Sequence, residues 1–186
     1  SEEQFKKAIL TAQDNCFAMG LTTIDDCGLG YETVEGIKKL QEAGELKMRL
    51  YVMLSDEKKN YDYADKTGMT KTERLNVRSF KVYGDGALGS RGACLLEPYS
   101  DKQGHFGFLL SNPEHFDSVA NWIYDKGWQM CTHAIGDSGN RTMLNIYAKY
   151  LKGKNDRRWR IEHAQVVNRY DFNLFGANSI IPSIQP

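Results

Sequence analysis

Residues 128–163, with the sequence WQMCTHAIGDSGNRTMLNIYAKYLKGKNDRRWRIEH, predict a strand, a helix and a second strand. The largely apolar runs 128–133 and 159–163 have the length of buried strands. Between them, apolar residues recur at helical spacing up to Leu151, and Asp137 stands where it can cap this helix. This order is typical of two parallel strands joined by a crossover helix.

The same alternation extends along the rest of the chain. Ser55 is expected to cap a polar, weakly periodic helix through about Asp65. Glycine or polar residues end most of the other segments. The predicted helices are 4–19, 32–43, 55–65, 112–124, 137–151 and 169–175, and the predicted strands are 21–26, 48–54, 78–84, 128–133, 158–163 and 179–184. We therefore expect an α/β fold with six parallel strands alternating with helices, in a single domain over residues 1–186.

Six such units fit either a doubly wound sheet or most of a TIM barrel. A complete (β/α)₈ barrel needs about 250 residues, so on the barrel interpretation one or two units lie outside this chain of 186 residues. The doubly wound interpretation would favour a nucleotide site. However, the glycine-rich segment 84–107 contains no Gly-Lys-Ser/Thr and is not directly followed by a helical pattern.

Composition excludes several classes of partner. Lys plus Arg equals Asp plus Glu at 24 each, so no basic excess exists to bind nucleic acid or an acidic membrane surface. No apolar run approaches the roughly 20 residues of a membrane span. The four cysteines have no paired spacing, which favours reduced thiols. The N-terminal residues do not resemble a signal peptide, so we expect a cytoplasmic protein. Since the chain starts at Ser1 and ends at Pro186, we also expect a longer parent, which could be exported.

Three predicted strands carry potential metal ligands at or near their ends: Lys81, His133 and His163. In parallel α/β folds, the C-terminal ends of the strands converge on one edge. Two histidines on neighbouring strand ends could bind one metal ion, with the second nitrogen of each ring held by an acceptor. The alternative is that each histidine is an ordinary packed or surface residue.

Other polar residues leave two interpretations open. Arg91, in the glycine-rich segment, could donate to a substrate carbonyl or carboxylate, or form a structural ion pair. Cys131 could be a thiolate nucleophile or a packed interior thiol. Asp25 and Asp26 could contact a metal or cap the next turn, and His105 could line a substrate pocket or lie in a surface loop.

Five segments, taken in order, resemble the YtcJ-like branch of the amidohydrolase superfamily, which includes N-substituted formamide deformylases. Their order and approximate spacing match, and the resemblance covers nearly the whole chain from Gly20 onward. The segments are KVYGDGALGSRGA at 81–93, EPYSD at 97–101, HAIGD at 133–137, RIEHAQ at 160–165 and IPSIQP at 181–186.

The resemblance implies a partial (β/α)₈ barrel that spans strands two to seven, without the first strand, the last strand and a flanking β-sandwich domain. Lys81 occupies the place of a strand-four lysine that can be carboxylated and bridge two divalent ions. His133 and His163 match the histidines of strands five and six. The implied cofactor is one or two divalent ions, expected to be Zn²⁺. The family's His-x-His pair and catalytic Asp are not matched, and the Asp is expected beyond residue 186.

The implied function is that of a central fragment of a metal-dependent hydrolase, which cleaves an amide or another non-peptide C–N bond of a small-molecule substrate. Arg91 and Gln165 are the candidates for orienting that substrate. The fragment alone is expected to be inactive, because part of the ligand set and the catalytic Asp lie outside it. The alternative is a non-catalytic barrel remnant that binds a small molecule without a complete metal site. Two unpaired sheet edges also predict self-association.

Overall fold

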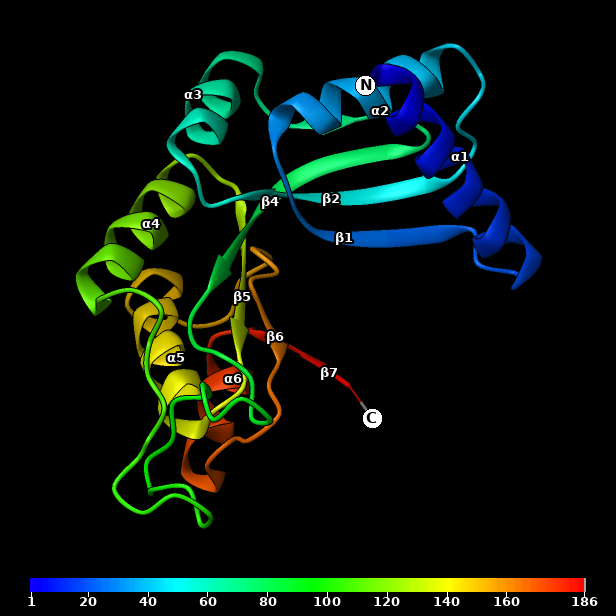
Figure 1. Cartoon of the computed structure of the whole chain (residues 1–186). Helices are drawn as coiled ribbons and strands as arrows, with labels where there is room; N and C mark the ends of the chain where they lie inside the picture. Colours follow the sequence, from blue (N-terminus) through cyan, green and yellow to red (C-terminus); the bar gives the residue numbers. More distant parts are fainter. Residues whose placement is uncertain (186) are drawn as a thin grey trace. The chain divides into compact units, whose positions relative to one another are not determined.

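The computed structural model describes residues 1–185. Pro186, the last residue of the IPSIQP segment, lies outside the described part. The chain divides into two compact units, Ser1–Ser79 and a second that begins at Phe80 (Figure 1). Strand β4, Leu75–Tyr83, starts in the first unit and ends in the second. The expectation of a single domain stays a prediction.

The first unit places helices and strands in alternation. Strand β1 pairs in parallel with β2, with Thr23 opposite Arg49, and Figure 1 shows α1 and α2 on one side of these two strands. The short strand β3 pairs antiparallel with the start of β4. The elements are α1 Glu2–Ala18, β1 Thr23–Leu29, α2 Tyr31–Glu42, β2 Arg49–Ser55, α3 Lys58–Thr67 and β3 Thr70–Lys71.

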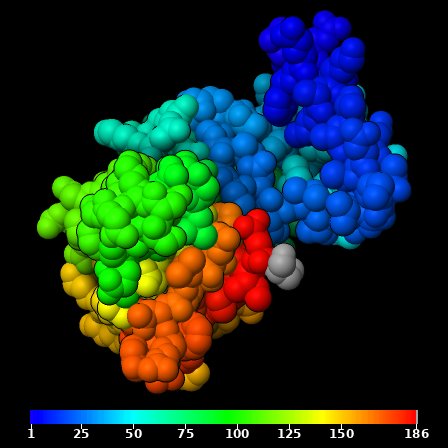
Figure 2. All heavy atoms as spheres, turned by 60° about the horizontal axis from the view of Figure 1, so that its bottom comes forward, coloured from blue at the N-terminus to red at the C-terminus, as the bar shows by residue number. Residues whose placement is uncertain are grey.

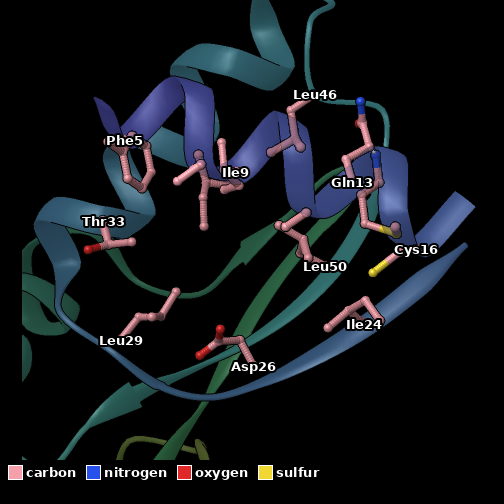
Figure 3. A pocket seen from close by; sticks show the side chains of 14 residues that line it. Phe5, Ile9, Gln13, Cys16, Ile24, Asp26, Leu29, Thr33, Leu46 and Leu50 are labelled. Atoms are coloured by element: carbon pink, nitrogen blue, oxygen red, sulfur yellow. Dashed lines mark hydrogen bonds between the residues drawn. The ribbon is translucent and has the colours of Figure 1, made fainter. Parts of the chain in front are cut away.

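Helix α1 packs loosely on this unit. Ser1 and Gln4 form a capping box at its start, and Gln13 is its one buried residue. The Gln13 side chain accepts hydrogen bonds from the backbone N–H groups of Lys47 and Met48. Figure 3 shows the apolar side of α1 facing Ile24 and Leu50 of the strands across a cavity of about 360 Å³. The buried residues of this unit include Val34 and Ile37 of α2 and Val52, Met53 and Leu54 of β2.

The second unit continues the alternation. Helices α4 and α5 lie side by side against β5 (Figure 1). Strand β5 pairs in parallel with β6, and β6 pairs in parallel with β7. The remaining elements are α4 Pro113–Asp125, β5 Gln129–Ala134, α5 Asp137–Leu151, β6 Arg160–His163, a 3₁₀ turn at Arg169–Asp171, α6 Phe172–Ala177 and β7 Ile181–Ile184. In Figure 2 the red atoms of β7 lie at the surface of this unit, and most of its residues are exposed.

The strands follow the hydrogen-bonded order β1-β2-β4-β5-β6-β7. Apart from β3, which pairs with β4, each strand stands next to its neighbour in sequence, as in a (β/α)₈ barrel, whereas a doubly wound sheet reverses its strand order at a switch point. The predicted fold class, α/β strands in partial-barrel order, is confirmed. In the part of the chain that the structure describes, no helix is both long and apolar enough to cross a membrane.

Two predicted helix caps are wrong. Ser55 is the last residue of β2, and α3 begins later, at Lys58, with Glu57 at its N-cap. Asp137 is the first residue of α5 rather than its cap, which is Gly136. The Asp137 carboxylate accepts hydrogen bonds from the backbone N–H groups of Ser138 and Leu96. It is therefore shared between the start of the helix and a residue distant in sequence. The two-residue strand β3 was also missed, because it is too short to show a period.

A buried tyrosine joins α5 to the sheet of the second unit. Tyr147 and Thr132 are fully buried, and their hydroxyl oxygens lie 2.7 Å apart. The Tyr147 hydroxyl also donates to the carbonyl of Arg160, at 3.0 Å. The Tyr147 ring packs edge-on against Trp159, with ring centroids 4.8 Å apart. One hydroxyl thus connects α5 with both β5 and β6.

We predict that Tyr147→Phe lowers the free energy of unfolding by about 1–3 kcal/mol, because it removes both hydrogen bonds from a buried site and leaves the ring packing in place. Urea unfolding followed by circular dichroism measures the effect. Tyr170→Phe is the matched control, since Tyr170 is 71% exposed and its hydroxyl accepts from Arg169 at the surface. The control should change stability by less than about 0.5 kcal/mol. Equal effects of the two variants would contradict the assigned role of Tyr147.

Candidate metal centre

The ends of β5 and β6 bring two histidines together. The register places His133 opposite Glu162 and Ala134 opposite His163, so the histidines stand on adjacent strands, offset by one position. Their ring centroids are 4.6 Å apart, and the ring planes meet at 70°. The structure thus brings together the two strand-end histidines that the sequence singled out.

Lys81 lies on β4, the strand before β5 in the hydrogen-bonded order. It is 2% exposed, and its Nζ is 4.1 Å from the centroid of the Tyr83 ring. The Tyr83 ring in turn lies 5.8 Å from the ring of His133. Burial of an amine next to an aromatic ring restricts its hydration and holds it in one place. The third predicted ligand is therefore close to His133.

The environment of His133 favours its neutral form. Burial lowers the pKa of His133 below its usual value, and repulsion from Lys81 and from His163 lowers it further. The backbone carbonyl of Gly86 and the carboxylate of Asp85 act in the opposite direction. A neutral imidazole keeps a lone pair on one nitrogen, which is the form that binds a metal ion.

Each histidine has one ring nitrogen next to an oxygen atom. Nε2 of His133 lies 3.5 Å from the carbonyl oxygen of Gly86, and Nδ1 of His163 lies 2.7 Å from Oε1 of Gln185. When these nitrogens carry the protons, the lone pairs sit on Nδ1 of His133 and Nε2 of His163. This is the arrangement in which a second-shell acceptor orients a metal-binding imidazole.

The backbone is strained at the end of β6. His163 and the following Ala164 have φ values of 72° and 41°. Positive φ values cost non-glycine residues of the order of 1 kcal/mol or more, and such residues cluster at functional sites. Positive φ also occurs at Arg91, Lys152, Arg158 and Ser179, but His163 and Ala164 are the one consecutive pair among the described non-glycine residues.

Asp85 and Gln185 are the residues near this site that sequence reasoning missed. Asp85 is fully buried and its carboxylate lies 3.6 Å from Nε2 of His133. A signal for Asp85 was present, because an acidic residue between Gly84 and Gly86 directly follows a strand. Gln185 lies two residues after Ser183 and had no such signal, because its role comes from the pairing of β7 with β6.

The other predicted site residues lie elsewhere in their units or have other partners. Arg91 forms a two-pronged ion pair with Asp101, as close as 2.7 Å. Gln165 is exposed after β6. The ring of His105 lies 2.8 Å from the carbonyl of Arg91, inside the glycine-rich loop. The structure supplies the ion pair that was the alternative for Arg91, and a substrate role for Arg91 or Gln165 stays a prediction.

Two further candidates have the surroundings of structural residues. Cys131 is fully buried, which agrees with a packed thiol. Asp26 borders the cavity under α1 (Figure 3), and burial raises the pKa of its carboxyl group. The cavity belongs to the first unit, whereas the two histidines belong to the second.

The donors of the second unit fit part of a metal site. Two imidazoles are suited to Zn²⁺, and a lysine contributes once its amine is neutral or carboxylated. Among residues 1–185, no three His, Cys, Asp or Glu side chains form a group that could hold a metal ion. The described residues therefore offer two histidines and one lysine as candidate ligands, and no larger cluster of the usual ligand types.

Comparison with known proteins finds relatives that align with the whole chain. The chain is 27% identical over 200 residues to the protein LONG AFTER FAR-RED 3 of Arabidopsis thaliana, and it spans 34% of that protein. It is 27% identical over 191 residues to a Bacillus subtilis (strain 168) protein named "Putative amidohydrolase YtcJ", of which it spans 36%. In both alignments all of this chain is covered.

Solved structures with a similar fold are also found. An uncharacterized metal-dependent hydrolase from Pyrococcus furiosus superposes with a TM-score of 0.80 at 26% identity, over 94% of this chain and 36% of that one. An uncharacterized metal-dependent hydrolase from Pyrococcus horikoshii OT3 has the same TM-score at 23% identity, over 94% of this chain and 35% of that one, which shows a shared fold. The chain spans about a third of the length of the relatives it matches. The family model described as "Amidohydrolase family" matches residues 1–186, and the chain belongs to this family.

Proposed function

We propose that this chain is the central part of a hydrolase that cleaves an amide or another non-peptide C–N bond with water activated by a divalent metal ion. One observation carries the proposal: the rings of His133 and His163 meet at neighbouring strand ends, 4.6 Å apart. Family membership supports hydrolase chemistry, and the kinship with a metal-dependent hydrolase supports a divalent ion.

Three residues would hold the ion: His133 through Nδ1, His163 through Nε2, and Lys81. The acceptors next to the opposite ring nitrogens, Gly86 and Gln185, would keep each imidazole in the required tautomer. Zn²⁺ is the expected ion, because it accepts nitrogen and oxygen ligands in a tetrahedral set that leaves room for water. When bound, such an ion supplies a hydroxide near neutral pH and polarises a carbonyl group.

The burial of Lys81 favours its conversion to a carbamate. A neutral Lys81 amine would add to carbon dioxide, forming a new N–C bond and releasing one proton. The product is an anion with two oxygen donors. It would replace the positive charge that now opposes a metal ion beside His133. Lys81 is 2% exposed, and this burial restricts the hydration that stabilises the ammonium form.

The remaining parts of the activity are assigned to residues outside this chain. The proton shuttle and the additional metal ligands are expected in other segments of the longer protein. Arg91 could reach a substrate carboxylate only if its ion pair with Asp101 opened or was shared. Gln165, exposed after β6, has the freer side chain for orienting a small-molecule substrate.

A second candidate is a barrel remnant that binds a small molecule without catalysis. It is favoured by the lack, within residues 1–185, of a cluster of three usual metal ligands. The two candidates differ in a measurable way. In the full-length protein, the hydrolase must lose release of amine from N-acyl substrates after His133→Ala, whereas the binding remnant releases none before or after the change.

Self-association follows from the strand order. β1 and β7 stand at its two ends, so each offers an edge that is unpaired within the described sheet. Unpaired edges bind other strands because their backbone N–H and carbonyl groups lack partners. We propose that copies of this chain associate through these edges.

We predict that the chain binds Zn²⁺ and that His133→Ala or His163→Ala weakens binding at least about tenfold, because each variant removes one imidazole ligand. Equilibrium dialysis against Zn²⁺ measures the affinity. His115→Ala is the matched control, since His115 is exposed in the first turn of α4. Full-length protein that neither contains nor takes up a divalent ion would refute the metal site.

We predict a carbamate on Lys81 when the chain is kept in ¹³C-labelled bicarbonate with Zn²⁺. A carbamate resonance should appear in the ¹³C spectrum of the wild type, disappear in Lys81→Ala and persist in Lys149→Ala. Lys149 is a suitable control because its ammonium group is exposed and paired with Asp117. A resonance that survives Lys81→Ala would place the carbamate on another lysine.

We predict that sedimentation velocity shows dimers or larger species whose fraction rises with concentration. Ile181→Lys should reduce association, because it adds a charge to the exposed strand β7. Met19→Lys is the control, since Met19 is 79% exposed and lies outside the strands. A monomer at all concentrations, with a high melting temperature, would contradict edge pairing.

A further inference from the structure

Asp85 is a buried carboxylate directly after β4. It is fully buried, and it belongs to the segment Gly84-Asp85-Gly86 at the start of the glycine-rich loop. A carboxylate in such a position must have its charge offset by hydrogen-bond donors, because burial otherwise favours the protonated form. The hydrogen-bond partners of Asp85 therefore indicate the role of its side chain.

Three backbone N–H groups donate to this carboxylate. Oδ1 accepts from Ile135 at 2.9 Å, and Oδ2 accepts from Gly136 at 2.8 Å and from Cys94 at 2.9 Å. Two donors belong to the turn between β5 and α5, directly after His133 and Ala134, and the third belongs to the glycine-rich loop. One side chain thus ties both loops to the end of β4.

Close packing leaves this carboxylate no freedom to move. A Cβ on Gly139 would lie 2.6 Å from Oδ2 of Asp85, and a Cβ on Gly136 would lie 2.1 Å from the carbonyl oxygen of Cys94. Both glycines permit an approach that any other residue would block. Three hydrogen bonds and the close approach of Gly139 therefore hold the Asp85 oxygens in place.

The same carboxylate faces the ring of His133. Oδ1 of Asp85 lies 3.6 Å from Nε2, and the carbonyl oxygen of Gly86 lies 3.5 Å from the same nitrogen. Two oxygens, one of them negatively charged, attract a proton on Nε2 and would repel a lone pair there. The proton is thereby favoured on Nε2 and the lone pair on Nδ1.

We propose that Asp85 is a positioning residue for the metal site: it holds the His133 imidazole in the Nε2–H tautomer, with Nδ1 turned to the ion. The role of Nδ1 as a ligand atom rests on the proposed function, whereas the tautomer itself does not. Asp85 acts through His133, because its hydrogen bonds go to backbone N–H groups and its carboxylate faces the His133 ring.

Asp137 provides a matched comparison within the same loops. Its Oδ1 accepts from the backbone N–H groups of Leu96 and Ser138, both at about 3 Å, so it also joins the glycine-rich loop to α5. It has no hydrogen bond or ion pair with His133 among the described contacts. Asp137→Asn therefore disturbs the same loop junction without changing the charge next to Nε2.

The test measures the tautomer directly. Long-range ¹H–¹⁵N spectra of the 186-residue chain, labelled with ¹⁵N-histidine, show which ring nitrogen carries the proton at about pH 8, where imidazole is neutral. His105→Gln and His115→Gln help to assign the four histidine signals. We expect the Nε2–H tautomer for His133 in the wild type and in Asp137→Asn, and a mixture or the Nδ1–H tautomer in Asp85→Asn. Zn²⁺ affinity should fall about 10- to 100-fold in Asp85→Asn alone.

Two results would overturn the proposal. The first is a wild-type His133 that carries its proton on Nδ1. This result needs no variant, so the test stays decisive even if Asp85→Asn does not fold. The second is an unchanged tautomer in folded Asp85→Asn. If the tautomer follows Asp85 but neither the chain nor the full-length protein binds Zn²⁺, the positioning role stands and the proposed metal function fails.

Discussion

The second unit is organised around one buried negative charge. The carboxylate of Asp85 takes hydrogen bonds from the turn after β5 and from the glycine-rich loop, and the adjacent glycines let both segments come close to it. Without these donors a fully buried carboxylate would be unstable, and without the carboxylate three buried N–H groups would lack an acceptor. The loop that follows β4 and the turn that follows β5 consequently depend on each other for their conformation.

This dependence has a direct consequence for the candidate site, because His133 is the last but one residue of β5. Its ring lies near the oxygens of Asp85 and Gly86 and near the ring of His163. Burial and nearby positive charge keep it neutral. On β6 the backbone itself is strained at His163. Rigid support on one strand and strain on the next are compatible with the preorganised ligand pair that we propose.

Family membership and local geometry answer different questions about this chain. The family match places the chain in the amidohydrolase family, and the similarity to a metal-dependent hydrolase supports the hydrolase chemistry that we propose. They say nothing of which bond is cleaved. Geometry brings the rings of His133 and His163 together, and the described residues hold no cluster of three usual ligands. In a (β/α)₈ barrel the active-site residues come from the ends of several strands and lie far apart in sequence. A chain that spans about a third of such a protein therefore contains only some of them.

Sequence alone determined the alternation of strands and helices, because burial of a strand or of one helix face leaves a period that can be read locally. It also placed His133 and His163 at strand ends, since position along a strand is a local property. The tertiary structure decided the rest. The pairing of Arg91 with Asp101, the loss of both predicted caps and the approach of Gln185 to His163 depend on residues distant in the chain. The role of Asp85 was hidden for the same reason: its three donors are backbone N–H groups from two other segments, and a backbone N–H looks the same in every residue type except proline.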